Sequence, residues 1–428
     1  MFTKRVKTAE EQTLQFVLLV YCLSLFFSFL LYYFQIFQSV LILVVLMQIL
    51  IPAFSITYIL YRCYSNKIGF KLAFELFCIK QKLKRELLDA HIYFDVNSQN
   101  HVKIVKLPKI QLYFIKDKLH ISIENSIKFQ SKLESLDISA ALGRYIVDDF
   151  YMNDTQSQFI YELDAIDNDR RLIYHSLDAI KNNRHSDYCI AIDKELQFNI
   201  CHALIAGATG MGKSYFLYYI VLVFLSRFSF ENLYIIDPKS SSMAVIGRMI
   251  GNIAVTKQES LLLLREFHKK MEERKKEISP LLETGLEKDY TDFNLEPIFL
   301  LFDEYATFRS SIKTMSKAER DEIEEIIDTI ILQGRQLGCF IMIAMQKSDA
   351  TLLPTHIRNS LLLKIVLGQA ENTTYITAFE HAQVPNRKLG TGEAFYTLQG
   401  KTTRPRYLKT PFLDFDIYQA VKSLCEDN

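Results

Sequence analysis

The sequence predicts an α/β protein in three parts: a hairpin of two membrane helices, a small α+β domain, and a larger α/β domain with a phosphate-binding loop. Three observations lead to this prediction. No charged residue occurs between Glu11 and Arg62. Residues 101–129 alternate apolar and polar side chains as β-strands do. A complete GxxxxGK[ST] motif spans residues 207–214, directly after a buried-strand pattern.

The composition excludes several protein classes. The chain has 428 residues, nearly half of them apolar, and a slightly positive mean hydropathy. With only 14 Gly and 9 Pro, it is neither collagen-like nor of low complexity. Its 50 basic and 49 acidic residues nearly balance, so total charge does not indicate a nucleic-acid partner. Seven scattered cysteines without a CxxC pair are typical of a reduced, cytosol-facing protein.

The first 65 residues predict a membrane anchor with two spans, about 14–34 and 39–61. Each apolar run has the length of a membrane-spanning helix. The short break between them is residues 35–38, and Pro52 inside the second run is tolerable in a membrane helix. A buried helical hairpin and a cleaved signal peptide are the disfavoured alternatives, because two adjacent uncharged runs of this length suit neither.

The flanks predict the orientation of this hairpin. Basic residues precede the first span and follow the second, whereas the connection has no charge; they are Lys4, Arg5, Lys7, Arg62, Lys67 and Lys71. Both termini and everything after residue 62 are therefore expected in the cytoplasm. Tyrosines near the span ends suit the membrane interface: Tyr32, Tyr33, Tyr58, Tyr61 and Tyr64.

Residues 66–187 predict a small α+β adaptor domain. A helix is expected over residues 70–90, followed by strands near 101–106, 111–115 and 119–123. Between Arg62 and Lys128 there are 13 basic and 6 acidic residues, a local excess of +7. Two interpretations stay open: attraction to anionic lipid headgroups, or a collar that faces DNA.

The phosphate loop is the first motif of the predicted α/β domain, residues 188–428. The strand pattern from His202 leads into the motif, and a helical pattern follows from Tyr215. In such loops the glycines let backbone N–H groups surround the phosphates, the lysine contacts the β- and γ-phosphates, and the serine hydroxyl binds Mg²⁺. The predicted nucleotide contacts are Gly207, Ala208, Thr209, Gly210, Met211, Gly212, Lys213, Ser214 and Tyr215.

A second buried-strand pattern, residues 297–302, ends in Asp303 and Glu304. An aspartate at this position suits a Walker B role in holding Mg²⁺, so Ser214 and Asp303 are the predicted metal ligands. Glu304 is the candidate general base for the attacking water. The alternative is an ordinary acidic pair at a strand end.

Two further strand patterns end in Asp237-Pro238-Lys239 and in Gln346. Polar residues at the carboxyl ends of parallel strands face the ligand crevice, which makes Gln346 a candidate γ-phosphate sensor. A helix with isoleucines at helical spacing precedes the last strand and is expected to end at Gln333-Gly334-Arg335. Arg335, expected on the turn into that strand, is either an arginine finger for a neighbouring subunit or a solvated charge at a helix end.

Six motifs in order resemble the FtsK/SpoIIIE family of ring-forming DNA motors. They are the phosphate loop Ala203–Ser214, the strand signature Tyr234–Lys239, the helix segment Lys270–Lys275, the acidic strand Leu301–Ala306, the arginine-to-glutamine stretch Gly334–Gln346 and the glycine hairpin Leu389–Tyr396. The resemblance covers roughly Tyr188 onwards. It implies a RecA-like motor domain, ATP and Mg²⁺ as ligands, a homo-oligomeric, hexameric ring, and a trans role for Arg335.

Chromosome-segregation members of that family have more membrane helices and a C-terminal winged helix. Two predicted spans and about 28 residues after Gly400 instead resemble the small coupling proteins of conjugative plasmids and transposons in Gram-positive bacteria. This implies an ATP-driven DNA translocase with a relaxase partner and backbone contacts to DNA of little sequence specificity. The alternatives are a protein-secretion ATPase, a segregation pump and a non-enzymatic adaptor. Arg309, Lys313 and Lys317 are either pore-lining residues or solvated charges.

Overall fold

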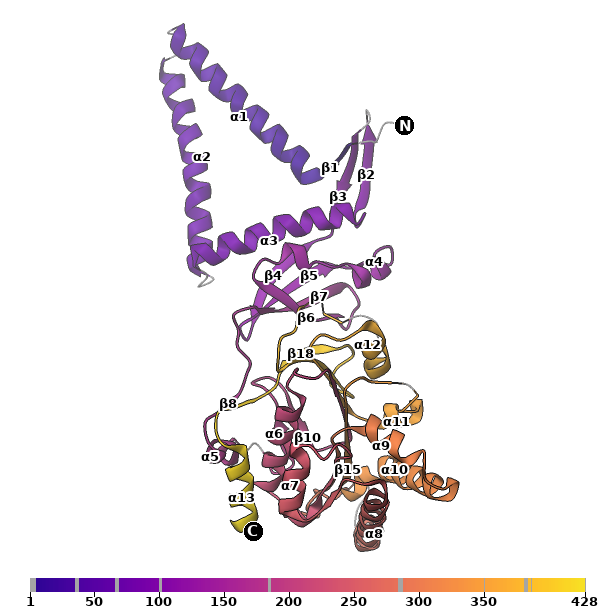
Figure 1. Cartoon of the computed structure of the whole chain (residues 1–428). Helices are drawn as coiled ribbons and strands as arrows, with labels where there is room; N and C mark the ends of the chain where they lie inside the picture. The colour runs from indigo at the N-terminus through magenta and orange to yellow at the C-terminus, as the bar shows by residue number, and fades with distance from the viewer. Residues whose placement is uncertain are drawn as a thin grey trace. The chain divides into compact units, whose positions relative to one another are not determined.

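The computed structural model describes residues 5–34, 38–65, 69–99, 102–183, 186–283, 288–349, 351–380, 384–385 and 387–427 (Figure 1). The chain divides into two compact units, Met1–Asn168 and Asp169–Asn428. The predicted division into anchor, adaptor and motor, with a boundary at residues 187 and 188, stays a prediction. Lys4, Lys67, His101 and the predicted break at residues 35–37 lie outside the described residues.

The first unit contains both helices and strands. They are β1 Arg5–Thr8, α1 Ala9–Tyr33, α2 Gln38–Ser65, α3 Phe70–Asp89, β2 Phe94–Gln99, β3 Val102–Lys106, β4 Ile110–Ile115, β5 Lys118–Glu124, α4 Gln130–Ser135, η1 Ser139–Ala141, β6 Tyr145–Met152 and β7 Gln158–Ala165. The predicted helix at residues 70–90 and the three predicted strands correspond to α3, β3, β4 and β5. Strand β1 was not predicted, because a run of four residues in which only Val6 is apolar is too short to show a strand pattern.

Helix α1 is long and apolar enough to cross a membrane. Thr8 caps its first turn by accepting from the backbone N–H of Glu11, whose carboxylate accepts from the N–H of Thr8 in return. Its apolar side chains point outward, as Phe16 (65% exposed) and Phe26 (61% exposed) illustrate. Exposed aromatic rings on such a helix suit a lipid environment. One long apolar helix near the N-terminus therefore indicates membrane anchoring.

Helix α2 covers the predicted second span and contains Pro52. Among its described residues, the stretch Val44–Phe54 is apolar but shorter than a span. The two helices contact each other through polar groups: Gln48 Nε2 donates to the hydroxyls of Ser24 and Ser28, each at 3.1 Å. Such hydrogen bonds stabilise helix pairs in lipid. The second span and the cytoplasmic orientation stay predictions.

The rest of the first unit packs α3 onto a small sheet. Strands β4, β5, β7 and β6 form an antiparallel sheet in that order, and β1 pairs in parallel with β3 beside β2. The buried face of α3 carries Ile79, Leu83 and Leu87 at spacings of four residues, which is one side of a helix. This face packs in the same apolar cluster as Ile121 of β5 and Leu163 of β7.

The second unit is an α/β domain. Its elements are β8 Ile173–Tyr174, α5 Leu177–Asn182, β9 Cys189–Ala191, β10 Gln197–Asn199, β11 Ala203–Gly207, α6 Lys213–Leu225, η2 Phe230–Asn232, β12 Leu233–Ile236, α7 Ser242–Ile250, β13 Ile253–Ala254, α8 Lys257–Leu282, β14 Ile298–Phe302, α9 Tyr305–Ile312, α10 Lys317–Leu337, β15 Cys339–Met345, α11 Thr355–Ser360, β16 Leu363–Leu367, α12 Asn372–Phe379, β17 Glu393–Leu398, β18 Arg406–Lys409, β19 Phe412–Leu413 and α13 Ile417–Asp427.

The main sheet has the order β13-β12-β14-β15-β11-β16-β17-β18 in the described part of the chain. The strands from β13 to β16 are parallel, and β17 and β18 are antiparallel additions at one edge. Strands β11, β12, β14 and β15 are buried along their whole length, as expected for parallel strands covered on both faces. Helices α6, α7 and α13 cover one face of the sheet and α8 and α10 the other (Figure 1).

The predicted α/β class is therefore confirmed, and two helix boundaries differ from prediction. Helix α6 begins at Lys213 rather than at Tyr215, because Gly212 in a left-handed conformation ends the phosphate loop there. Helix α10 continues to Leu337, and Gly338 in the left-handed region ends it. Arg335 thus lies in the last helical turn, not on the connection to β15.

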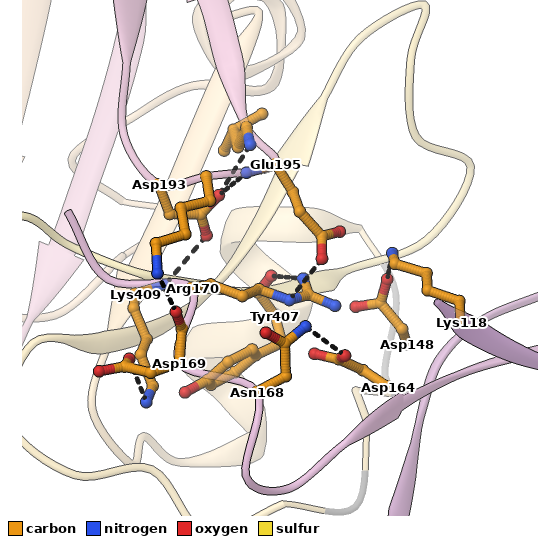
Figure 2. A network of polar contacts seen from close by, with 12 residues as sticks. Lys118, Asp148, Asp164, Asn168, Asp169, Arg170, Asp193, Glu195, Tyr407 and Lys409 are labelled. Atoms are coloured by element: carbon orange, nitrogen blue, oxygen red, sulfur yellow. Dashed lines mark hydrogen bonds and ion pairs between the residues drawn. The ribbon is translucent and has the colours of Figure 1, made fainter. Parts of the chain in front are cut away.

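A polar network holds the first residues of the second unit in place (Figure 2). Arg170 is 3% exposed; its Nε lies 3.1 Å from Glu195 Oε1, and its Nη1 donates to the carbonyl of Tyr407 at 3.3 Å. Asp169 pairs with Lys409 at 2.9 Å. These contacts to β18 and to the β9–β10 hairpin explain why the second unit begins at Asp169, upstream of the predicted motor start.

Candidate functional site

The phosphate loop joins β11 to α6 at the carboxyl edge of the main sheet. Gly210 and Gly212 have φ angles of 84° and 96°, which glycine adopts without strain. A side chain at Gly207 would bring its Cβ to 2.8 Å from the Cβ of Leu367 in the adjacent strand β16. The loop thus has the predicted strand–loop–helix form, with Ser214 and Tyr215 exposed in the first turn of α6. Backbone N–H groups at this helix start are suited to bind phosphate.

Glu304 lies at the centre of the site. It is 3% exposed, and three donors surround its carboxylate: Lys213 Nζ at 3.3 Å, Lys239 Nζ at 3.0 Å and the backbone N–H of Gln346 at 3.3 Å. A buried carboxylate needs such partners, because an unpaired charge in the interior is costly. Lys213 also donates to the carbonyl of Asp303 at 3.4 Å. The structure therefore brings the predicted lysine and the predicted base into direct contact.

The hydroxyl group of Ser241 lies between the carboxylates of Asp303 and Asp237. Ser241 Oγ lies 3.0 Å from Asp303 Oδ2 and 2.7 Å from Asp237 Oδ2. Burial raises the pKa of Asp303, and Asp237 adds to this shift, whereas Lys213 opposes it. Ser241 has one hydroxyl proton and can donate it to only one of the two carboxylates at a time. This arrangement leaves negative charge at Asp303 that a cation would neutralise.

The residues present fit Mg²⁺. This ion prefers oxygen ligands and is commonly held by one or two protein groups together with phosphate oxygens and water. Asp303 at the end of β14 and Ser214 in the first turn of α6 are the residues that would hold it. Among the described residues no group of three His, Cys, Asp or Glu side chains could hold a metal by itself.

A second loop, residues 390–392, packs directly on the phosphate loop. The N–H of Gly392 donates to the carbonyl of Met211 at 3.0 Å, and the hydroxyl of Thr391 donates to the carbonyl of Gly210 at 3.4 Å. A Cβ on Gly212 would lie 3.2 Å from the backbone nitrogen of Gly392. The predicted glycine hairpin, Leu389–Tyr396, thus supports the phosphate loop.

No family model matches this chain. Over 197 residues it is 29% identical to the FtsK domain-containing protein YdcQ of Bacillus subtilis (strain 168), a match that covers 45% of this chain and 40% of that relative. The chain resembles the FtsK-domain proteins. The match spans less than half the length of this curated relative.

Solved structures with a similar fold include the pCW3 conjugation coupling protein TcpA in a monomer form with ATPγS. It is 17% identical with a TM-score of 0.49, over 74% of this chain and 94% of that chain. The cytoplasmic domain of the Thermomonospora curvata type VII secretion ATPase EccC is 17% identical with a TM-score of 0.43, over 59% and 32%. The genome packaging NTPase B204 of Sulfolobus turreted icosahedral virus 2 is 14% identical with a TM-score of 0.31, over 50% and 98%.

Arg335 lies away from the phosphate loop of this FtsK-like chain. It occupies the last turn of α10, which leads into the first residue of β15, whereas the phosphate loop follows the last residue of the parallel neighbour β11. Burial lowers the pKa of His202, which precedes β11, and the nearby charge of Arg335 lowers it further. Arg335 and the phosphate loop therefore lie at opposite edges of the sheet, and the Arg335 side chain is exposed. The trans role of Arg335 stays a prediction.

Gln346 directly follows β15, at the carboxyl edge of the main sheet where the phosphate loop also lies. Its side chain is exposed and lines a cavity of about 480 Å³ together with Lys239, Glu304 and Thr307. This placement is compatible with the predicted sensor role, which stays a prediction.

The three candidate pore residues differ in their surroundings. Arg309 pairs with Glu324 of the same chain at 2.8 Å. Lys313 and Lys317 are exposed between α9 and the start of α10. The structure thus engages Arg309 within its own chain, and the pore-lining role of Lys313 and Lys317 stays a prediction.

The sequence alone assigned no role to three contributors to the site: Lys239, Ser241 and Gly392. Lys239 and Ser241 follow strand β12, and their position after a buried parallel strand was the available signal. Gly392 is distant in sequence from the phosphate loop, so no local pattern could have connected the two.

Proposed function

We propose that this chain is a membrane-anchored ATPase that moves DNA, acting as a coupling protein in conjugative transfer. The observation that carries the enzymatic part is the buried Glu304 carboxylate, held between Lys213 and Lys239 at the phosphate loop. A protein that only bound ATP would have no use for a base positioned in this way.

In the proposed mechanism each residue has one task. The backbone of the phosphate loop and Lys213 bind the phosphates, and Glu304 orients and deprotonates the attacking water. Mg²⁺, held by Asp303 and Ser214, would neutralise phosphate charge. Arg335 of a neighbouring subunit would complete the site, which is why a ring of six subunits is proposed. When Lys213 turns to the phosphates, Lys239 and the N–H of Gln346 keep Glu304 in place.

The DNA-moving role is supported by the resemblance to FtsK-domain proteins. DNA would be bound through its backbone, with little dependence on sequence. A relaxase is the proposed partner that delivers the DNA. The helix α1, and with it α2, would anchor the chain with both termini in the cytoplasm. The rival proposal is a protein-secretion ATPase, for which a DNA strand would not be the substrate.

The test uses the full chain in detergent or nanodiscs. We expect ATP turnover that rises when DNA is added, loss of nucleotide binding in Lys213→Ala, and retained ATP without turnover in Glu304→Gln. Binding of labelled ATP and release of phosphate are measured separately. Turnover in either variant at the wild-type rate would refute the enzymatic assignment. Turnover that responds to a secretion-signal peptide and not to DNA would favour the rival proposal.

A further inference from the structure

The first unit contains a basic cavity beside the start of α1. Its volume is about 990 Å³, and four lysines line it: Lys80 and Lys84 on α3, Lys106 at the end of β3, and Lys109 in the turn after β3. The lysines on α3 are four residues apart and therefore lie on one side of the helix. Two separate segments of the chain thus direct positive charge to one concave surface.

The acidic residues of the cavity already have partners. Glu10 pairs with Lys84, and the Glu124 carboxylate accepts from the backbone N–H of Lys109 at 3.0 Å. Four lysines and two glutamates leave a charge of +2 on the lining residues. The lining therefore carries a net positive charge on a concave surface, which suits an anion.

The position of the cavity indicates which anion. Glu10 in its wall is four residues before Leu14, the first residue of the apolar run, which is about 6 Å along a helix. The headgroup layer on each side of a bilayer is roughly 5–7 Å thick. When α1 lies in a membrane, the cavity therefore lies at the level of the lipid phosphates. Leu107, Pro108 and Tyr113 add apolar and aromatic surface to its lining.

We propose that this cavity binds the phosphate headgroup of an anionic phospholipid. The proposal rests on the membrane anchoring proposed above, but not on ATP hydrolysis or DNA transport. Basic pockets at the membrane surface bind such headgroups, and each basic residue near the surface contributes attraction. A concave site suits a single headgroup better than DNA, whose closely spaced row of phosphates needs an extended basic stripe.

The experiment measures lipid retention by native mass spectrometry of the full chain. The protein is released from nanodiscs made of equal parts phosphatidylcholine and phosphatidylglycerol, and retained lipids are counted by class. We expect the wild type to keep phosphatidylglycerol selectively. Lys80→Gln with Lys84→Gln should reduce this retention by about fivefold for each lysine removed, the factor that corresponds to ~1 kcal/mol per basic residue.

Two further double variants make the test specific. Lys106→Gln with Lys109→Gln changes the other wall without removing the Glu10–Lys84 pair, and should cause the same loss. Lys82→Gln with Arg85→Gln removes equal charge from exposed positions of α3 that do not line the cavity, and should retain lipid as the wild type does. Equal loss of retained phosphatidylglycerol in all three double variants would indicate non-specific attraction between basic residues and anionic lipid, and would overturn the proposal.

Alternative ligands have their own outcomes. Pyrophosphate bound as firmly as phospholipid in lipid-free detergent would indicate a soluble ligand. Loss of duplex DNA binding in the cavity variants, with lipid retention unchanged, would indicate a nucleic-acid surface. Either result overturns the lipid assignment. Flotation of the protein with liposomes of phosphatidylcholine alone tests the anchoring separately, and Lys213→Ala should abolish nucleotide binding without changing lipid retention.

Discussion

At the scale of single residues, the site depends on how one buried carboxylate is shared between donors. Glu304 contacts both Lys213 and Lys239. Lys213 is also the residue that phosphate would attract. Lys239 therefore has a distinct task, which is to hold the base in position when Lys213 moves to the nucleotide.

Replacing Lys239 tests this division of tasks. Lys239→Met should lower kcat by about ten- to a hundredfold, part of the 10²–10⁴ that a positioned base contributes, and leave ATP affinity nearly unchanged. Lys239→Arg should restore part of the rate, since it keeps the charge. Lys347→Met is the matched control, because Lys347 lines the same cavity but pairs with Glu371 at 2.6 Å. Weaker ATP binding with an unchanged kcat would assign Lys239 to the nucleotide instead.

His202 gives a prediction about pH. Its Nδ1 accepts the backbone N–H of Ile341 at 3.1 Å, so the ring is neutral, and burial lowers its pKa from 6.5 to about 4. The unfolded chain binds a proton below pH 6.5 and the folded chain does not until about pH 4. The stability contribution is therefore complete above pH 6.5 and is lost as pH falls towards 4, by up to roughly 3 kcal/mol.

The measurement is the free energy of unfolding of the second unit at pH 7 and pH 5. His202→Asn keeps an acceptor for the Ile341 N–H but does not titrate, so it should lose less stability than the wild type between these pH values. Identical pH dependence in the two proteins would contradict the assignment of a neutral, buried ring.

At the scale of elements, the phosphate loop near the start of the second unit is supported by a loop near the end of that unit. Residues 390–392 precede β17, an antiparallel strand added beside β16. Gly392 has a φ angle of 73°, and a Cβ there would lie 3.0 Å from both Arg171 Nη2 and Thr410 Oγ1. Arg171 Nη2 also donates to the carbonyl of Thr391 at 3.2 Å. The start of the second unit is therefore linked to the phosphate loop through this turn.

Two alanine variants separate crowding from backbone strain. Gly392→Ala should weaken ATP binding roughly tenfold, or ~1.4 kcal/mol, because the displaced turn no longer supports Met211 and Gly212. Gly400→Ala is the control, since its φ of 80° imposes the same backbone strain, yet no atom lies within 4 Å of the added carbon. Calorimetric titration with an ATP analogue gives both affinities. Equal effects of the two variants would show that only backbone strain matters.

At the scale of the whole molecule, the position of Arg335 shows that it cannot reach the phosphate loop of its own chain. Strand β15, with seven residues, separates the end of α10 from the carboxyl edge of the sheet, a distance of about 23 Å. No side chain covers that span. An arginine finger at this position would therefore act on a neighbouring subunit.

A mixing experiment checks the trans role. Arg335→Ala should bind ATP normally but hydrolyse it about 10³–10⁵-fold more slowly, the range known for arginine fingers. Lys213→Ala is also inactive. A mixed ring can place an intact phosphate loop beside an intact Arg335, so part of the activity should return. If mixed rings form, as shown by differently tagged subunits, and remain inactive, Arg335 is only a solvated charge at a helix end.

The sequence by itself determined those features whose evidence is contained in one short segment. The phosphate loop, the acidic strand end at Asp303–Glu304, the apolar helix α1 and the buried strands β11, β12, β14 and β15 all follow from local pattern. Hydrophobic periodicity and the spacing of a motif depend only on residues that are close in the sequence. They can therefore be recognised without knowledge of the fold.

Only the tertiary structure decided which distant residues meet. Lys239 reaches Glu304 because β12 and β14 are adjacent strands, and Gly392 reaches Met211 because β17 lies next to β16. The lysines of the basic cavity come together because β1 pairs with β3 at the start of α1. These contacts depend on strand order and helix packing, which arise from long-range burial of apolar surface rather than from the local pattern of the chain.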